Sequence, residues 1–549
     1  MTAYDYQLLI KHLLEHGVAW APDQEILYRD NFRYTYRDMY QRVLKLASAL
    51  QQLGVSQGTK VGVIERDSHR YLEMYFGIPG IGAVLHTINP NLAPESVLYT
   101  MEHAEDEVLI FHEDFLPLAE QARERLPGIR HFIVIMDGGE VELPFTALEY
   151  EVLVESAEPL QILPDFSEDT QATLSYTTGT TGVPKGVYFS HRQLVLHTFA
   201  GWGSVAVFGN DGGLNKHDVY MPLTPMFHVH AWGLPYVATV FGLKQIYPGY
   251  YDYEMILRLI QEEKATFTHC VPTILQRVLE VAEAGNADLS GWKVIIGGAR
   301  LTKGLAKRAQ ALGIDITGGY GLSESCPFLT LASLRPSMEK HGSDEAQLDV
   351  RIKTGFPMPL VKIRVVGPDG KDVEGDGSET GEIVVRSPWL TPGYYKDTNR
   401  TEELWAGGWM HTGDVANVDD AGYIQIVERM KEIIKSGGEW IVSLELENIL
   451  SLHDDVMEAG VIGVPDEKWG ERPLAVVVPM KGKEEILSTE VLQDHLNAAV
   501  KAGLIAKWAV PDHFVIVAEL PKTSVGKIDK KALRKQYPMP PGSEFMKDS

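Results

Sequence analysis

Strand-like runs alternate with amphipathic helical segments through much of this chain. The stretch 35–38 has the form of a capping box, and apolar residues follow it at helical spacing until Gly54. A strand-like run at 61–64, a helical segment at 68–76 and another strand-like run at 106–111 continue the pattern. Such alternation favours layers of α/β structure.

The chain has 549 residues, enough for one large domain and a smaller one. The α/β pattern returns between 294 and 317, gives way to short β-rich runs between 362 and 423, and resumes in a compact form from 432 to 534. We therefore expect an α/β fold with a large N-terminal domain, 1–430, that includes a β-rich subdomain. A small α+β C-terminal domain, 431–549, would follow a hinge near 431.

The net charge of the chain limits the kinds of molecule that it is expected to bind. The formal net charge is −25, which argues against binding nucleic acid or an anionic membrane as a main function. Two cysteines, Cys270 and Cys326, exclude a disulfide scaffold and a cysteine-based metal site. The charged N-terminus and the lack of a membrane-length apolar run predict a cytoplasmic protein without a stable membrane anchor.

One loop has the composition of an oligophosphate site. The stretch 176–186, YTTGTTGVPKG, follows a strand-like run at 172–176 and holds four threonines, three glycines and a lysine. Glycines let backbone N–H groups turn onto phosphate oxygens, and the hydroxyls and the ammonium add further donors. The spacing excludes a Walker-type P-loop. A polar surface turn is the alternative interpretation.

Four other segments carry residues suited to a nucleotide site. In 318–325 a glycine turn after a strand would project Tyr320 and Glu324 into a cleft, where the carboxylate could hold Mg²⁺ or remain a solvated loop residue. In 411–414, Asp414 could accept hydrogen bonds from ribose hydroxyls. The charged stretch 428–440 lies where a linker is expected, and 521–528 is a polar loop that carries Lys527.

These five segments, in this order, resemble the acyl- and aryl-CoA synthetases of the adenylate-forming superfamily, which also includes firefly luciferase and peptide-synthetase adenylation domains. The resemblance covers 35–534. The stretches PMFHVHAW at 225–232 and KSGGEWI at 435–441 look most like bacterial fatty-acyl-CoA synthetases for medium and long chains. Two residues beside the hinge differ from the family pattern: Glu428 stands where many members have glycine, and Glu432 where many have aspartate. The differences affect only the expected local geometry of the hinge.

The resemblance implies a role for each matching residue. ATP phosphates would bind to the loop residues Thr177, Thr178, Gly179, Thr180, Thr181, Gly182 and Lys185. Adenine would lie against Tyr320 near Gly298, Ala299 and Gly321. Ser323 would contact the α-phosphate, Glu324 would hold Mg²⁺, and Asp414 and Arg429 would bind the ribose.

The resemblance also implies a mobile C-terminal domain that turns about Lys431. In the first step Lys527 would bridge the acid's carboxylate and the α-phosphate. After rotation, Gly437 and Gly438 would line the channel for the coenzyme A thiol, and Lys435 and Trp440 complete the expected cofactor-binding residues.

The aromatic segment 225–236 is expected to bind the acyl chain. In the resembling fatty-acid enzymes the tryptophan at the place of Trp232 gates a tunnel for the alkyl chain, and the histidine at the place of His228 lies near the carboxylate. Ordinary core packing is the alternative for both. An aspartate at the start of this segment would be expected for an amino-acid substrate, and none is present.

The expected function is therefore ATP-dependent ligation of a medium- or long-chain fatty acid to coenzyme A through an acyl-adenylate, with Mg²⁺. The alternatives are a CoA ligase for a short thioether or aryl acid, a luciferase-type oxidoreductase, and a binding protein without activity. By analogy with the fatty-acid enzymes, the N-terminal region around Thr35 is the segment expected to form a homodimer.

Overall fold

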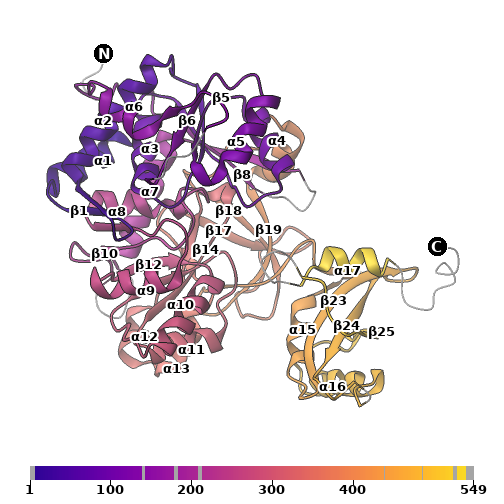
Figure 1. The fold of residues 1–549 in the computed structure, drawn as a ribbon. Helices are drawn as coiled ribbons and strands as arrows, with labels where there is room; N and C mark the ends of the chain where they lie inside the picture. The colour runs from indigo at the N-terminus through magenta and orange to yellow at the C-terminus, as the bar shows by residue number, and fades with distance from the viewer. Residues whose placement is uncertain are drawn as a thin grey trace. The chain divides into compact units, whose positions relative to one another are not determined.

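The computed structural model describes residues 6–138, 143–177, 183–207, 213–437, 439–484, 486–522 and 528–538. The chain forms two compact units. The larger holds 1–363, 384–411 and 422–424, and the smaller holds 364–383, 412–421 and 425–549. The expectation of a large N-terminal and a small C-terminal part in an α/β fold is confirmed (Figure 1). The boundary at 431 and its role as a hinge stay predictions.

A seven-stranded sheet lies in the larger unit, with the order β7-β6-β5-β3-β4-β8-β9. All neighbouring strands in it are parallel except β8 and β9, which are antiparallel. The strands are β3 (Lys60–Ile64), β4 (Val84–Thr87), β5 (Asp106–His112), β6 (His131–Ile135), β7 (Leu148–Glu149), β8 (Gln171–Thr177) and β9 (Lys185–Ser190).

A nine-stranded sheet, also in the larger unit, has the order β16-β15-β14-β13-β12-β10-β11-β1-β2. Its strands are β1 (Glu25–Tyr28), β2 (Phe32–Thr35), β10 (Val219–Tyr220), β11 (Lys244–Tyr247), β12 (Phe267–Cys270), β13 (Lys293–Ile296), β14 (Asp315–Gly321), β15 (Phe328–Leu331) and β16 (Phe356–Pro357). The central strands β12, β13 and β14 are parallel and in register, so side chains at matching positions share one face.

Helices connect these strands. They are α1 (Lys11–Trp20), α2 (Tyr36–Gln52), α3 (His69–Gly80), α4 (Pro94–Ala104), α5 (Leu116–Arg125), α6 (Tyr150–Ser156), α7 (His191–Val205), α8 (Leu234–Phe241), α9 (Tyr253–Glu262), α10 (Pro272–Ala284), α11 (Lys303–Ala311), α12 (Pro336–His341), α13 (Asp344–Arg351) and α14 (Thr398–Leu404). Helix α2 begins where the sequence predicts, because Thr35 and Asp38 form the reciprocal hydrogen bonds of a capping box.

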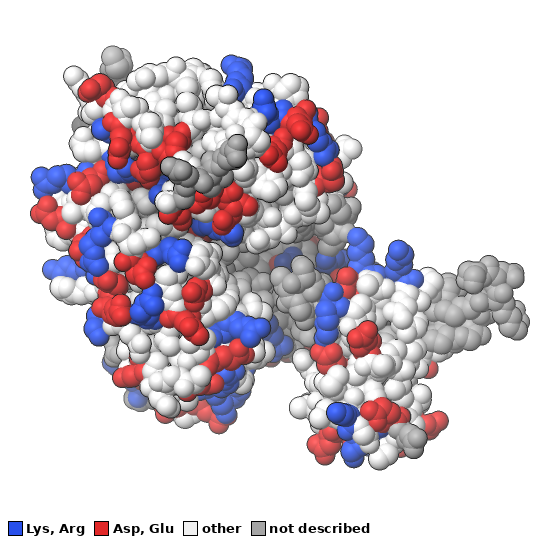
Figure 2. Space-filling model, viewed as in Figure 1, with Lys and Arg blue, Asp and Glu red and all other residues white. Residues whose placement is uncertain are grey.

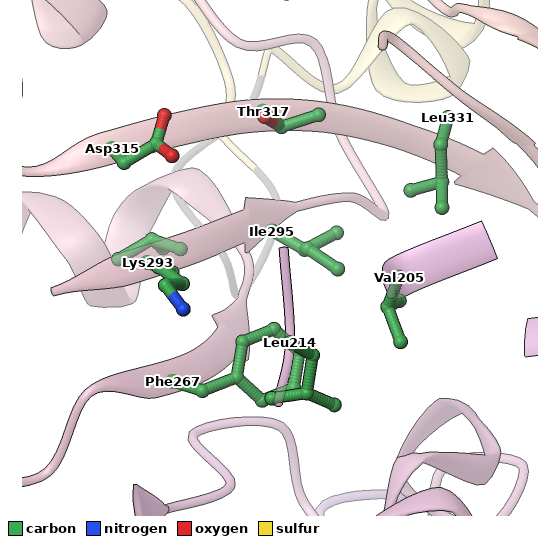
Figure 3. A pocket seen from close by; sticks show the side chains of 9 residues that line it. Val205, Leu214, Phe267, Lys293, Ile295, Asp315, Thr317 and Leu331 are labelled. Carbon is green, nitrogen blue, oxygen red and sulfur yellow. The ribbon is translucent and has the colours of Figure 1, made fainter. Parts of the chain in front are cut away.

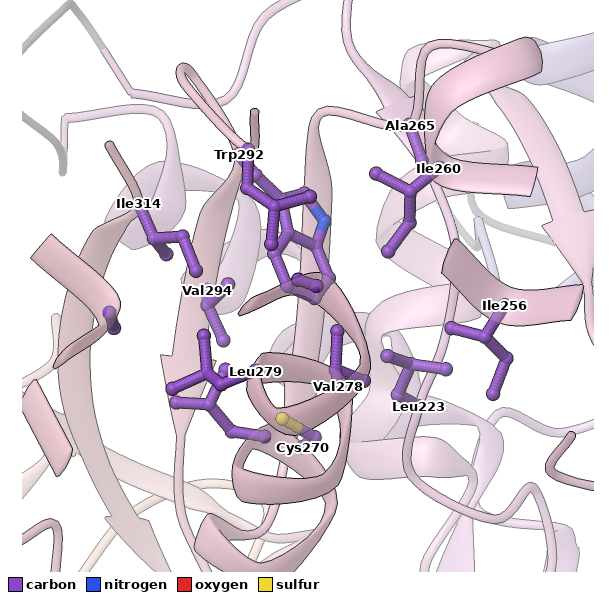
Figure 4. Close-up of a cluster of buried hydrophobic side chains, with 14 of the residues drawn as sticks. Leu223, Ile256, Ile260, Ala265, Cys270, Val278, Leu279, Trp292, Val294 and Ile314 are labelled. Carbon is purple, nitrogen blue, oxygen red and sulfur yellow. The ribbon is translucent and has the colours of Figure 1, made fainter. Parts of the chain in front are cut away.

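The side chains of strand β13 alternate between a hydrophobic core on one face of the nine-stranded sheet and the opposite face. Val294 and Ile296 pack with apolar residues of α9, α10 and α11 (Figure 4). Because side chains alternate along a strand, Lys293 and Ile295 point to the other face, where the candidate site lies. Close apolar packing therefore fills one face of the sheet at β13, and Lys293 and Ile295 line a small pocket on the other face.

The remaining strands belong to a four-stranded and a five-stranded sheet. The four-stranded sheet contains β17 (Lys362–Val366), β18 (Gly381–Arg386), β19 (Met410–Val418) and β20 (Ile424–Arg429). The five-stranded sheet contains β21 (Ile434–Ser436), β22 (Glu439–Ile441), β23 (Val456–Asp466), β24 (Gly470–Pro479) and β25 (His513–Ile516). Three helices accompany it: α15 (Ser443–Ser451), α16 (Thr489–Lys501) and α17 (Lys530–Gln536).

Two surface properties bear on the partner classes. Acidic and basic side chains are interspersed on the face of the larger unit drawn in Figure 2. Among the helices of the described residues, none combines the length and apolar character that crossing a membrane requires.

Candidate active site

The threonine- and glycine-rich loop connects two antiparallel strands. Thr177 ends β8, Lys185 begins β9, and the two residues are paired in the ladder. They therefore stand side by side at the base of the loop. The predicted phosphate ligands between them lie outside the described residues: Thr178, Gly179, Thr180, Thr181 and Gly182.

Lys185, Tyr394 and Glu324 meet in the larger unit. The Lys185 ammonium lies 4.5 Å from the centroid of the Tyr394 ring. The Tyr394 hydroxyl donates a hydrogen bond of 2.7 Å to Oε1 of Glu324. Burial, followed by the nearby Glu324 carboxylate, raises the pKa of Tyr394. Tyr394 therefore contacts both Lys185, the predicted phosphate ligand, and Glu324, the predicted Mg²⁺ ligand.

The prediction of a glycine turn at 318–321 is wrong, because these residues continue strand β14. Tyr320 and Gly321 pair with Thr330 and Phe328 of β15. A methyl group on Gly321 would lie 1.8 Å from the carbonyl oxygen of Pro327, so close backbone approach requires this glycine. Ser323 and Glu324 follow in a short 3₁₀ turn, Ser323–Ser325.

The Gly297-Gly298-Ala299 turn follows strand β13 and is covered by Trp232. A methyl group on Gly297 would lie 2.9 Å from Cη2 of the indole, and Gly298 has a φ of +71°. The indole also contacts the rings of His269, at 5.1 Å, and Phe328, at 5.8 Å. The turn expected near adenine and the tryptophan expected near the acyl chain are therefore neighbours.

Trp232 lies in a backbone turn of unusual conformation. The four residues Val229, His230, Ala231 and Trp232 have φ values of 39°, 59°, 46° and 59°, and Gly233 follows at 74°. Left-handed conformation is unfavourable for residues with a Cβ atom. Val229, His230 and Ala231 are themselves buried, so the surrounding packing holds this turn in place.

A small pocket of about 20 Å³, room for one or two water molecules, lies on one face of the nine-stranded sheet (Figure 3). It is lined by Val205, Leu214, Phe267, Lys293, Val294, Ile295, Asp315, Thr317 and Leu331. On β13, Lys293 and Ile295 face the pocket, and Gly297, two residues further on, faces Trp232. The pocket and the indole therefore lie against different positions on the same face of β13.

The His228 side chain is exposed to solvent, and desolvation by nearby protein atoms lowers its pKa to about 4. The ring is neutral at pH 7 and packs on Phe227, with 4.7 Å between ring centroids.

A buried carboxyl group fixes the backbone before His228. Asp67 is 3% exposed and accepts hydrogen bonds of 2.7 Å from the Met226 N–H and from the Tyr251 hydroxyl. Tyr75 donates to the Met226 carbonyl oxygen. Desolvation raises the pKa of Asp67 to about 7, against the opposing effect of these hydrogen bonds.

This raised pKa predicts how Asp67→Asn changes stability with pH. The Asp67 carboxyl stays protonated in the folded protein up to a pH of about 7, whereas in the unfolded chain it ionises near pH 3.9. Its contribution to the free energy of unfolding is therefore complete below pH 4 and is lost as the pH rises to 7. An amide cannot ionise, so the variant should gain stability relative to the unaltered protein over this range, by at most about 4 kcal/mol. Urea unfolding at pH 5 and 8 measures the difference, with Asp169→Asn at an exposed position as the control. Parallel pH profiles for the two proteins would contradict the prediction.

In the smaller unit, Asp414 and Arg429 form the pair that the sequence indicates. Nε of Arg429 lies 2.8 Å from Oδ1 of Asp414, which is 2% exposed, whereas Arg429 is 53% exposed. The N–H of Met430 donates to the Gly413 carbonyl oxygen, which holds the two segments together. Gly413 has a φ of +68°, but Asp414 itself lies within strand β19.

The other predicted residues of the smaller unit lie on β20 to β22 and the chain between them. Lys431 follows β20, and desolvation lowers its pKa. Lys435 and Trp440 are paired across β21 and β22. Gly437 has a φ of +62°, and a methyl group there would lie 2.7 Å from the Trp469 indole. Gly438 and Lys527 lie outside the described residues.

Glu324 has the chemistry of a magnesium ligand. Within the described residues, no group of three or more His, Cys, Asp or Glu side chains could hold a metal. Mg²⁺ bound with nucleotides typically takes one or two carboxylates and fills its other positions with phosphate oxygens and water. A single carboxylate, accepting one hydrogen bond from Tyr394 through Oε1, fits that requirement.

Two family models match the chain. The model described as AMP-binding enzyme covers residues 14–395, and the AMP-binding enzyme C-terminal domain covers residues 445–527. The chain belongs to the AMP-binding enzyme family. Its structural neighbours are acyl-CoA synthetases of the adenylate-forming superfamily, as the resemblance predicts.

Three members of the family illustrate the similarity. The long-chain-fatty-acid–CoA ligase of Thermus thermophilus is 41% identical over 98% of this chain and 97% of its own length. The 3-methylmercaptopropionyl-CoA ligase of Ruegeria lacuscaerulensis is 37% identical over 96% and 97%. The solved structure of a Mycobacterium tuberculosis fatty acyl CoA synthetase has a TM-score of 0.75 at 26% identity, over 97% of this chain and 98% of that one.

The structure adds contacts to this AMP-binding enzyme site that the sequence alone did not indicate. Tyr394 follows a Pro-Gly turn signal, but nothing local shows that its hydroxyl reaches Glu324. Asp67 and Met226 are separated by 159 positions, and only the tertiary fold brings them together. Tyr394 and Asp67 belong to no predicted motif. Tyr394 contacts the predicted Mg²⁺ ligand Glu324, and Asp67 holds the backbone next to the predicted substrate residue His228.

Proposed function

We propose that this AMP-binding enzyme ligates a medium- or long-chain fatty acid to coenzyme A, through an acyl-adenylate and with release of pyrophosphate and AMP. The observation that carries the proposal is the similarity to the long-chain-fatty-acid–CoA ligase of Thermus thermophilus, 41% identical over nearly the full length of both chains. The position of Trp232 against the Gly297-Gly298 turn supports it, because the resembling fatty-acid enzymes have a gating tryptophan at this place.

The first step joins two anions. A fatty carboxylate is ionised at neutral pH and needs no base to act as a nucleophile. Its attack on the α-phosphate must overcome charge repulsion, which the Lys527 ammonium and the donors of the 177–185 loop are proposed to offset. Mg²⁺, held by Glu324, would supply charge neutralisation on the phosphate oxygens. Asp414 and Arg429 are proposed to position the ribose.

In the same step His228 and Trp232 are proposed to orient the acid. A neutral His228 can hydrogen-bond to a carboxylate or phosphate oxygen without adding charge. Trp232 lies against the glycine turn, and we propose that it gates the entry of the alkyl chain, as the tryptophan at this place does in the resembling fatty-acid enzymes. This position also helps to keep water from the acyl-adenylate, a reactive mixed anhydride.

The second step forms the thioester and releases AMP. We propose that the C-terminal domain turns about Lys431 between the two steps, so that Lys527 leaves the site and the coenzyme A thiol enters. Lys435, Gly437, Gly438 and Trp440 would then line the thiol channel. The proposal places the enzyme in the cytoplasm and expects a homodimer, by analogy with the fatty-acid enzymes.

A panel of acids distinguishes this function from its alternatives. The purified protein is given ATP, Mg²⁺, coenzyme A and one acid of a series: straight-chain acids from 4 to 18 carbons, 3-methylmercaptopropionate, and benzoate. AMP and thioester are measured together. We expect kcat/KM for at least one acid of eight or more carbons to exceed that for the thioether and aryl acids by roughly a hundredfold or more. A preference for 3-methylmercaptopropionate, as in the name of the Ruegeria relative, would replace the proposal with its alternative.

A further inference from the structure

We propose that Glu428 is a positioning residue that latches one conformation of the predicted hinge, and that its contacts set the balance between the two half-reactions. This inference rests on the proposed function, in particular on the proposed turn about Lys431. Glu428 is one of the two residues beside the hinge that differ from the family pattern. Its proposed role is to hold a conformation of the chain, and it contacts no substrate.

Glu428 lies on β20, before the hinge, and its partners follow the hinge in the sequence. Its Oε2 atom accepts hydrogen bonds from the Ser443 hydroxyl and, at 3.0 Å, from the Leu444 N–H. The Lys530 ammonium lies 3.6 Å from the same oxygen. Glu428 is buried, and the smaller unit contains all four residues. The latch, as we name these contacts of Glu428 with Ser443, Leu444 and Lys530, therefore spans Lys431.

Helix α15 receives its N-terminal cap from Glu428. The residue at the N-cap position is Val442, whose side chain forms no capping hydrogen bond. The first N–H groups of a helix have no partner within the helix, and a carboxylate there also interacts favourably with the helix dipole. Glu428 supplies this carboxylate by accepting from the Leu444 N–H. A residue before the hinge thus completes a helix that lies after it.

The latch can open without leaving a buried charge alone. Lys530 also donates to the Ser443 hydroxyl at 2.7 Å and pairs with Glu447 at 2.8 Å. These three residues all follow the hinge, so they stay together when it turns. Only the contacts of Glu428 are lost, and water can take their place. Hydrogen bonds to a charged group shift an equilibrium by roughly tenfold to a hundredfold, which suits a reversible change between two conformations.

The other glutamate beside the hinge has its partner on its own side. Glu432 pairs with Arg534 of α17, and both residues follow Lys431. This ion pair moves with the C-terminal domain, so a turn about Lys431 does not break it. Glu432→Gln is therefore a matched control for Glu428→Gln, because it is the same exchange four positions away.

Fluorescence energy transfer between the two units tests the latch directly. Dyes are attached at Glu124→Cys in the larger unit and Gln493→Cys in the smaller unit, both exposed positions. The two cysteines of the chain itself are buried. Single molecules are measured with ATP and Mg²⁺, and then with AMP and coenzyme A. We expect two populations, whose ratio changes at least roughly tenfold in Glu428→Gln and stays the same in Glu432→Gln.

The half-reactions give a second readout. ATP–pyrophosphate exchange measures adenylation, and thioester formation from supplied acyl-adenylate measures the second step. One half-reaction uses the latched conformation and the other does not, so the ratio of their rates should change with the ratio of the two populations. In Glu428→Gln we expect this rate ratio to change at least roughly tenfold. A merely structural role for Glu428 would lower both rates together.

A second variant keeps the inference testable if Glu428→Gln does not fold. Ser443→Ala removes one hydrogen bond to Glu428 and should shift both ratios in the same direction by a smaller factor. If the folded latch variants leave both ratios unchanged, or if Glu432→Gln shifts them equally, the latch is overturned and the proposed function stands. If neither pair of ligands changes the energy transfer in the unaltered protein, the proposed turn about Lys431 fails together with the latch. If the unaltered protein forms no thioester from any acid of the panel, the proposed function itself fails.

Discussion

Replacement of Lys527 by alanine is expected to slow acyl-adenylate formation by at least about a hundredfold to a thousandfold. The reason is electrostatic, because this ammonium is proposed to lie between two anions, the carboxylate and the α-phosphate, as charge develops on phosphorus. The second half-reaction does not need it. Thioester formation from supplied acyl-adenylate and coenzyme A should therefore stay near its original rate. ATP–pyrophosphate exchange measures the first step, and release of AMP from the adenylate measures the second.

Lys522→Ala is the matched control for this prediction. Lys522 lies in the same C-terminal segment and forms an ion pair with Glu458, so its loss changes the local charge by the same amount. Both half-reactions should be preserved in this variant. An equal decline of the two half-reactions in Lys527→Ala would assign that lysine a structural role and refute its proposed part in adenylation.

Glu324→Gln is expected to slow adenylation by about a hundredfold and to raise the Mg²⁺ concentration needed for half-maximal activity. The amide oxygen can still accept the hydrogen bond from Tyr394, so the local structure should persist while the negative charge is lost. Adenylation rates over a Mg²⁺ titration test this, and calorimetry of ATP binding with and without Mg²⁺ gives a readout that is independent of turnover.

The control for the Glu324 prediction is Tyr394→Phe. This exchange removes the hydrogen bond and keeps the carboxylate, so we expect a reduction of about tenfold or less with the Mg²⁺ dependence unchanged. If Tyr394→Phe altered the Mg²⁺ dependence as strongly as Glu324→Gln, the hydrogen bond rather than the charge would be the decisive feature.

Local sequence signals predicted the elements that depend on local physics. The capping box at Thr35 and the apolar spacing that follows it predict helix α2, because both properties act within a few residues. The strand-like run at 294–296 predicts β13 for the same reason. The glycine-rich stretch 318–321 was misread as a turn, because its glycines serve close approach to Pro327 and Lys353, which lie later in the chain.

The candidate site likewise combines residues that motifs indicate with residues that only tertiary contacts bring together. Asp414 and Arg429, which the resemblance assigns to the ribose, lie close together in the smaller unit. The proximity of Trp232 and Gly298 in the larger unit is a finding of the structure. The groups around them are determined by tertiary contacts. The pairing of Lys293 with Asp218 joins residues 75 positions apart, and a lysine at the start of a strand has no local feature that distinguishes a pocket wall from a surface.

The left-handed turn before Gly233 has a consequence for the gating role that we propose for Trp232. Four successive residues with Cβ atoms hold positive φ values, at a cost of about 1–2 kcal/mol each. Trp232 is the last of them, so a shift of this backbone moves the indole that covers the glycine turn. Any shift that returns one of these residues to negative φ recovers that part of the cost. An alkyl chain would then need less binding energy to displace the indole than it would need if the backbone of this turn were relaxed.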